Sequence, residues 1–122
     1  MRRAMLVLLL VALGLGRTVC LSKNNAQTTV RVSLNDRVKL SLMANPSTGL
    51  QWTCTIAQPV VRVVSDRTLP PQTPGIVGAP TTRVLCLRPL GVGSTDVVCT
   101  HAWNTPTLPP AETLTFQLVI VP

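Results

Sequence analysis

Hydrophobic and polar residues alternate with a period of two along most of the chain after residue 28. Val30, Val32 and Leu34 alternate with polar residues, and the same pattern returns at residues 38–42 and 51–56. This alternation is typical of strands with one buried and one solvated face, whereas a helix would show a period of about 3.6. The other segments that we predict as strands, for a total of about seven, are residues 60–64, 83–88, 96–101 and 113–121.

Proline and glycine separate the predicted strands. The segment 69–80 holds four prolines and two glycines, which exclude regular sheet pairing, and residues 103–110 form a second proline-rich segment. Seven short strands with little helical periodicity and no internal repeat predict an all-β fold, an immunoglobulin-like antiparallel β-sandwich. Alternate connections in that fold emerge at the same end, so we expect one group of loops, at residues 43–50, 68–82 and 102–112.

The first residues have the pattern of a signal peptide. Arg2 and Arg3 precede an apolar run at residues 5–16, which at about 12 residues is shorter than the roughly 20 that a helix needs to cross a bilayer. We therefore expect residues 1–20 to be a signal peptide and residues 21–122 to be the mature domain, secreted or lysosomal/endosomal and without a membrane segment. Two small pairs offer cleavage sites, Gly14 with Gly16 and Thr18 with Cys20.

Removal of this leader lowers the charge of the chain. The full chain carries a formal charge of +7, whereas residues 21–122 hold eight basic and four acidic residues, a net charge of +4. The basic residues are scattered singly, and the chain offers only two Trp and one Phe for base stacking. This distribution argues against a nucleic-acid groove.

The sequence shows no obvious exposed edge that would favour association, so we expect the chain to be a monomer.

Residues suited to catalysis or metal binding are few. His101, the only imidazole, lies two residues after Cys99 on the same strand face, but a Cys/His nucleophile pair would also need a third group to orient the imidazole. A half-buried strand histidine is the better interpretation. The cysteines and His101 also lack the spacing of a metal site. We therefore predict that the chain is not an enzyme and binds no metal or cofactor.

One loop differs from the other connections. Residues 45–52 read Asn-Pro-Ser-Thr-Gly-Leu-Gln-Trp, in which Asn and Pro initiate a turn and Gly49 permits a positive φ. The loop carries no charge and leads directly into a strand whose Trp52 can anchor it in the core. An ordinary hairpin connection would have the same composition.

This segment resembles the signature Asn-Pro-Thr-Thr-Gly-aromatic-x-Trp of the chagasin-like inhibitors of papain-family cysteine peptidases. Residues 78–97 align without a gap on the central region of that family, and residues 116–120 are similar to its last strand. The resemblance covers nearly the whole mature chain. It implies an immunoglobulin-like sandwich in which three loops at one end form a wedge that enters the peptidase cleft.

The resemblance also implies the residues that contact the peptidase. In the central loop, Ser47 and Thr48 would face the catalytic cysteine, and Trp103 would be the main anchor unless it packs under its loop as core. The two flanking loops depart from the family pattern, because two of its glycines and its Arg-Pro-Trp signature are replaced. The implied contact residues are Asn45, Pro46, Ser47, Thr48, Gly49, Leu50, Gly78, Ala79, Pro80, Thr81, Trp103, Asn104 and Thr105.

Two functions follow from the sequence. The first is a secreted or endolysosomal inhibitor of papain-like cysteine peptidases such as cathepsin-L-like enzymes, and the alternative is a secreted immunoglobulin-like binding or adhesion module without inhibitory activity. On the strand alignment, Cys54 and Cys99 point inward on neighbouring strands, as a disulfide or as two packed thiols. Cys86 would face outward, either paired with Cys20 or free.

Overall fold

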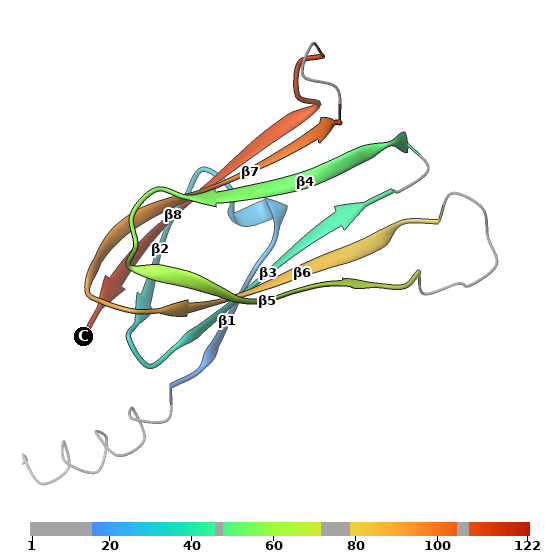
Figure 1. Cartoon of the computed structure of the whole chain (residues 1–122). Helices are drawn as coiled ribbons and strands as arrows, with labels where there is room; N and C mark the ends of the chain where they lie inside the picture. The colour runs from blue at the N-terminus through green and yellow to red at the C-terminus, as the bar shows by residue number, and fades with distance from the viewer. Residues whose placement is uncertain (1–15, 46–47, 72–78, 105–107) are drawn as a thin grey trace, which may run out of the picture.

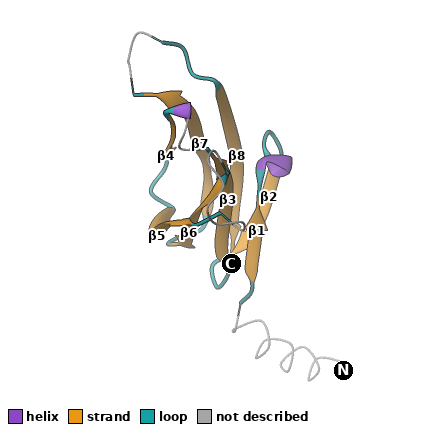
Figure 2. Ribbon diagram, turned by 90° about the vertical axis from the view of Figure 1, so that its right-hand side faces the viewer, coloured by secondary structure: helices purple, strands orange, loops and turns teal. Residues whose placement is uncertain are grey.

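The computed structural model describes residues 16–45, 48–71, 79–104 and 108–122, and these form two β-sheets packed face to face (Figure 1). Figure 2 shows the same layers from the side, with a short 3-10 helix beside them. The predicted sandwich is thus confirmed. The elements of the described residues are β1 (Thr18–Leu21), η1 (Lys23–Asn25), β2 (Thr29–Ser33), β3 (Arg37–Ala44), β4 (Leu50–Ile56), β5 (Val61–Leu69), β6 (Thr81–Pro89), β7 (Gly93–Trp103) and β8 (Glu112–Val121).

The sheets differ from the prediction in strand number and direction. The described residues form eight strands instead of seven, in the orders β1-β3-β6-β5 and β2-β8-β7-β4. β1 runs parallel to β3 and β2 runs parallel to β8, so both sheets are mixed and not purely antiparallel. Alternation in the sequence shows which face of a strand is buried but not which strand pairs with it, and β1 is too short to show a period.

The core lies between the sheets and follows the predicted alternation. On β8, Phe116, Leu118 and Ile120 face inward and are at most 1% exposed. Val38, Leu40 and Leu42 face inward on β3, in the opposite sheet, and are at most 2% exposed. Burial of each such side chain contributes roughly 1.5–3 kcal/mol. The alternating segments of the sequence therefore supply most of the apolar surface that joins the two layers.

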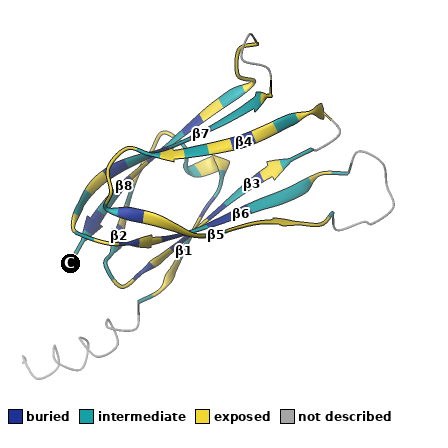
Figure 3. Ribbon diagram, viewed as in Figure 1, coloured by how far each residue is buried: buried dark blue, intermediate teal, exposed yellow. Residues whose placement is uncertain are grey.

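β5 forms the exposed edge of its sheet. Val61 is its one buried residue, and the rest of the strand is exposed apart from Ser65 (Figure 3). A bulge between Val63 and Ser65 interrupts its pairing with β6. Bulges and charged side chains are common devices against edge-to-edge pairing.

No helix in the described ranges is long and apolar enough to cross a membrane.

The cysteines divide into one pair and two thiols. Cys54 and Cys99 lie directly opposite each other on β4 and β7, and a disulfide joins them. Cys20 and Cys86 are free and flank Lys39 from the two neighbouring strands. Two strand spacings amount to about 10 Å, beyond the roughly 7 Å between Cα atoms that a disulfide can bridge. Pairing of Cys20 with Cys86 is therefore excluded in this fold.

Replacement of Phe116 tests the placement of the core. We expect Phe116→Ala to lower the free energy of unfolding by about 3–5 kcal/mol, because it opens a cavity between the two sheets. Met43→Ala is the matched control: this side chain is 70% exposed, and its loss should change the stability by about 0.5 kcal/mol or less. Urea unfolding of both variants measures the two values, and equal effects would contradict the assigned core.

Candidate functional site

Three connections open at the end of the sandwich that lies away from the C-terminus (Figure 1). The strand register places the connection between β3 and β4 in the middle. Ala44, where β3 ends, pairs with Thr81 at the start of β6, and Leu50, where β4 begins, pairs with Trp103 at the end of β7. The three connections thus share one end, as strand counting in the sequence predicted.

The central connection is not a hairpin, which corrects the alternative interpretation of residues 45–52. β3 and β4 belong to different sheets, so the chain crosses the top of the sandwich between them. The two flanking connections are hairpins, because β5 pairs with β6 in one sheet and β7 pairs with β8 in the other. The end of the sandwich therefore presents a crossing loop with one hairpin on each side.

Short hydrogen bonds close the described part of the central loop. The Thr48 N–H and hydroxyl both donate to the Asn45 carbonyl, at 3.1 and 2.7 Å, and the Leu50 N–H donates to the Thr48 hydroxyl at 3.2 Å. Gly49 has a φ of 79°, in the left-handed region that favours glycine. Pro46 and Ser47 lie outside the described residues. The remaining loop residues form a turn that is closed by its own backbone and by Thr48.

Trp103 lies against the central loop. A Cβ placed on Gly49 would be 3.8 Å from Cδ1 of the Trp103 indole, so the ring is in contact range of the turn. The side chain is nevertheless 40% exposed. The Trp103 side chain thus packs beside the loop and is still partly open to solvent. Asn104 is exposed, and Thr105 lies outside the described residues.

The other flanking hairpin is joined to the central loop at its base. Thr81 donates a hydrogen bond from its hydroxyl to the Ala44 carbonyl at 3.3 Å, where β3 ends. Ala79 is partly buried and Pro80 is exposed. Gly78 lies outside the described residues. This hairpin therefore approaches the central loop through Thr81, and Pro80 offers it no backbone N–H group.

Trp52 anchors the central loop from below. Its side chain is 4% exposed, and its indole N–H donates to the Met43 carbonyl at 2.9 Å. The indole stacks on the His101 ring, with a centroid distance of 4.3 Å and an interplanar angle of 3°. Met43 precedes the loop on β3 and Trp52 follows it on β4, so this hydrogen bond joins the two sheets below the crossing loop.

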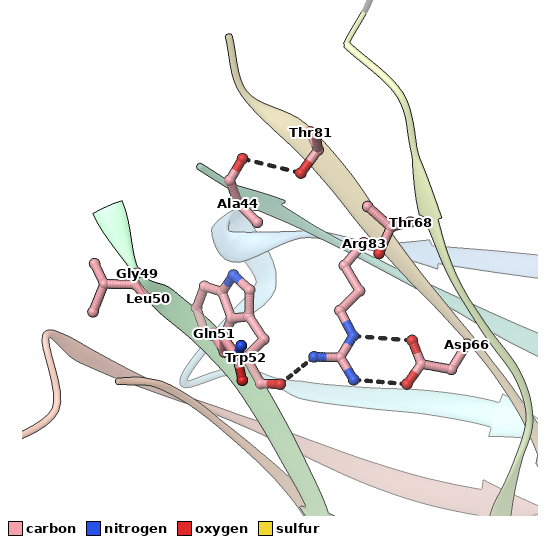
Figure 4. A pocket seen from close by; sticks show the side chains of 9 residues that line it. All are labelled: Ala44, Gly49, Leu50, Gln51, Trp52, Asp66, Thr68, Thr81 and Arg83. Atoms are coloured by element: carbon pink, nitrogen blue, oxygen red, sulfur yellow. Dashed lines mark hydrogen bonds and ion pairs between the residues drawn. The ribbon is translucent and has the colours of Figure 1, made fainter. Parts of the chain in front are cut away.

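Asp66 and Arg83 extend this connection, and sequence reasoning missed them. The Arg83 guanidinium binds the Asp66 carboxylate through Nε to Oδ1 at 2.9 Å and Nη2 to Oδ2 at 2.7 Å, and Nη1 donates to the Trp52 carbonyl (Figure 4). The guanidinium of Arg83 holds the pKa of Asp66 below its ordinary value of 3.8, and the pKa of Arg83 is raised in turn. The signal in the sequence was that Arg83 occupies an inward position, in step with Leu85 and Leu87.

A cavity of about 470 Å³ beside the central loop is lined by Trp52, Asp66 and Arg83. Figure 4 shows the Arg83 guanidinium between the Trp52 carbonyl on one side and the Asp66 carboxylate on the other. The other residues that line the cavity are Ala44, Gly49, Leu50, Gln51, Thr68 and Thr81. The hydrogen bond from Arg83 to the Trp52 carbonyl thus joins the two sheets near the point where the loop crosses, and Asp66 holds the guanidinium from within the sheet of Arg83.

The geometry around His101 gives no catalytic pair. Its Nδ1 lies 3.6 Å from Glu112 Oε1, its side chain is 12% exposed, and Cys99 is held in the disulfide with Cys54. Within the described ranges, no group of three or more His, Cys, Asp and Glu side chains could hold a metal ion.

Comparison with known proteins identifies the family. A model of the chagasin family peptidase inhibitor I42 matches residues 31–120. The chain belongs to the chagasin family. This match includes the central loop, Trp52, the ion pair of Asp66 with Arg83, and Trp103, so the family region holds all the described features of the candidate site.

Relatives of this chagasin-family chain are known from one organism in particular. The chain is 31% identical to amoebiasin-2 of Entamoeba histolytica over 103 residues. This alignment covers 82% of this chain and 83% of amoebiasin-2. The crystal structure of the cysteine protease inhibitor EhICP2 from the same organism matches with a TM-score of 0.79 and 29% identity over 86% of this chain and 96% of that one.

A more distant structure shares the fold alone. PbICP-C, solved in complex with falcipain-2, matches with a TM-score of 0.52 and 14% identity, over 87% of this chain and 91% of that one. At this identity the likeness extends to the sandwich and not to individual contacts. Among these relatives, the cysteine protease inhibitor EhICP2 matches this chain over nearly its own full length.

A pH titration tests the bond between Asp66 and Arg83. Because the pKa of Asp66 is lowered in the folded state, the ion pair stabilises the protein above the ordinary pKa of 3.8, and this stabilisation is lost as the pH falls through the folded-state pKa. We expect Asp66→Asn to lower the unfolding free energy at pH 7 by roughly 1 kcal/mol or less, since solvent screens a carboxylate that is 39% exposed.

Thermal unfolding of wild type and Asp66→Asn between pH 7 and pH 2 measures this effect. The two curves should converge at the acid end, where the carboxyl of the wild type is also neutral. Asp96→Asn is the control, because the Asp96 side chain makes no hydrogen bond or ion pair with the described residues. A difference that stays constant down to pH 2 would contradict the role assigned to the ion pair.

Proposed function

We propose that this chain is a secreted or endolysosomal inhibitor of papain-like cysteine peptidases, including cathepsin-L-like enzymes, and that it occupies their cleft with the three loops at one end of the sandwich. The single observation that carries this proposal is the crossing loop at residues 45–49, held between two hairpins and closed below by Trp52. The family of the chain and the inhibitor EhICP2 among its relatives support it further.

The mechanism that we propose is occlusion. The central loop enters the cleft, with Ser47 and Thr48 over the catalytic cysteine, and the flanking hairpins add contact area on each side. The hydrogen bonds of Thr48 to Asn45, and the anchor at Trp52, hold the described part of the loop before binding. A loop that is already ordered loses little conformational entropy in the complex, which favours tight binding.

Trp103 is the anchor that we propose for the third loop. Large aromatic side chains dominate the energetics of many protein interfaces. The ring is 40% exposed and lies against Gly49, so it is available to a partner and already oriented by the central loop. This support could replace part of what the family's Arg-Pro-Trp signature supplies at that position.

A binding or adhesion module without inhibitory activity is the second candidate. It is favoured by the residues of the flanking hairpins, where Ala79 and Pro80 stand in place of glycines and no arginine lies beside Trp103. Both candidates keep the same scaffold. They differ in whether the central loop must fit over a catalytic thiol.

Titration against peptidases separates the two functions. We expect recombinant chain 17–122, which keeps the whole of β1, to inhibit papain and a cathepsin-L-like peptidase in a dose-dependent manner and to leave a serine peptidase unaffected. Ser47→Glu should weaken this inhibition by about tenfold or more, because a bulky charge would be buried in the cleft; tenfold corresponds to about 1.4 kcal/mol.

The control for this substitution is Ser94→Glu, an exposed position on β7 at the opposite end of the sandwich. It should inhibit like the wild type. Absence of inhibition by a chain that is folded by circular dichroism would reject the inhibitor function, and the binding module would then be the better proposal.

Replacement of Trp103 tests the third loop. We expect Trp103→Ala to raise the inhibition constant by about 30-fold, as loss of a binding hot spot worth roughly 2 kcal/mol would. Val92→Ala, at a position 57% exposed in the connection between β6 and β7, should leave the inhibition constant unchanged. Equal inhibition constants for Trp103→Ala and the wild type would remove Trp103 from the interface.

A further inference from the structure

Asp36 is a buried carboxylate in the turn between β2 and β3. It is 5% exposed, and its Oδ2 accepts a hydrogen bond from the Ser33 N–H at 2.8 Å. Its cationic partner among the described residues is the Arg17 guanidinium, at 3.5 Å from Nε to Oδ2, and that side chain is 71% exposed. A buried carboxylate is ordinarily matched by a closer charge or by several hydrogen bonds.

The backbone nitrogen of Arg17 is closer to this carboxylate than the guanidinium. It lies 3.2 Å from Asp36 Oδ1 and donates a hydrogen bond to it. Strand pairing holds it there, because the Arg17 carbonyl accepts the Arg37 N–H at 2.8 Å and Thr18 pairs with Arg37 in the parallel register of β1 and β3. The position of this nitrogen therefore does not depend on the exposed Arg17 side chain.

The sequence before Arg17 is that of a signal peptidase site. Gly14 and Gly16 stand three residues and one residue before the Gly16–Arg17 bond, the places where this class of peptidase requires small residues. Cleavage after Cys20, the other site that the sequence allows, would remove three of the four residues of β1. It would also remove Val19, which packs against the core.

We propose that the leader is removed at the Gly16–Arg17 bond and that the new α-ammonium group of Arg17 forms an ion pair with the buried Asp36 carboxylate. In the hydrolysis, the C–N bond breaks and the hydroxyl of water joins the Gly16 carbonyl carbon. The Arg17 nitrogen takes up the remaining proton of the water and the proton that the new Gly16 carboxyl group releases, and so becomes an ammonium at neutral pH. The mature domain then begins four residues earlier than residue 21. This proposal rests on the secretion that the proposed function includes.

Gly16 itself provides a discriminating variant. In the uncut chain its φ is 69°, and a Cβ at this position would lie 1.8 Å from the Asn35 carbonyl oxygen. An alanine at residue 16 would therefore collide with the backbone if the residue were retained. Signal peptidases accept alanine at the same place, so the variant Gly16→Ala is harmless if the residue is removed.

The first experiment secretes the full chain from a eukaryotic host and determines the N-terminus by intact mass and terminal sequencing. We expect Arg17 as the first residue in the wild type and in Gly16→Ala, with equal unfolding midpoints, because residue 16 is absent from both. Gly16→Leu should not be cut at this bond. A first residue at Met1, Leu15, Val19 or Leu21, or a lower midpoint for Gly16→Ala, would overturn the proposal.

The second experiment tests the ion pair in the mature protein. Only the neutral amine reacts with acylating reagents, and a nearby buried carboxylate favours the charged form. At pH 7 we expect the Arg17 α-amino group to be acylated about tenfold more slowly in the wild type than in Asp36→Asn, the change that one pKa unit would produce. Asp96→Asn should react like the wild type, and equal rates in all three would reject the pair.

A further variant covers the case in which Asp36→Asn does not fold. One glycine kept before Arg17, as in chain 16–122, moves the ammonium away from Asp36 without the collision that a Cβ at residue 16 would cause, and this chain should unfold at a lower temperature than chain 17–122. An equal midpoint would contradict the ion pair. Papain inhibition is measured on chain 17–122 by itself, so failure of the cleavage proposal is distinguishable from failure of the proposed function.

Discussion

The hydrogen bond from the Trp52 indole to the Met43 carbonyl is the interaction on which the loop end of the sandwich depends. Met43 and Trp52 lie in different sheets, and sheets that pack face to face are about 10 Å apart. The crossing loop must span this gap, so its shape is defined only if the gap is fixed. Trp52 fixes it from within the core, and Arg83 repeats the connection from the other sheet through the Trp52 carbonyl. These two polar contacts thus hold the ends of β3 and β4 at a fixed separation below the crossing loop.

The fold was predictable from the sequence as far as alternation could show it. The inward residues of β3 were placed on the correct face, and those of β8 follow the same period of two. Strand partners could not be obtained in this way, because parallel pairing of β2 with β8 depends on residues far apart in the chain. β1 escaped prediction for a different reason, since its four residues lie at the end of the predicted leader. Its pairing with β3 became visible only in three dimensions.

The candidate site was predictable to a similar extent. The residues of the central loop carried a family signature, and strand counting grouped the three loops at one end. The bond between Arg83 and Asp66 required more, because a charge at an inward position shows that a partner is needed but not which one. The partner is set by the register of β5, and a bulge between Val63 and Ser65 shifts that register by one residue. A bulge leaves no signal in the alternation that could have located Asp66.

Gly49 links the conformation of the central loop to the exposure of Trp103. Its positive φ turns the chain into β4, and its missing side chain leaves room for the Trp103 ring at contact distance. A residue with a Cβ would strain the turn through its positive φ, while the Cβ itself would meet the indole only at ordinary contact distance. The central loop and the hairpin of β7 and β8 therefore meet where Gly49 lies against Trp103. Changes in the flanking hairpins can then alter the contact area while the relation between the central loop and its aromatic neighbour is preserved.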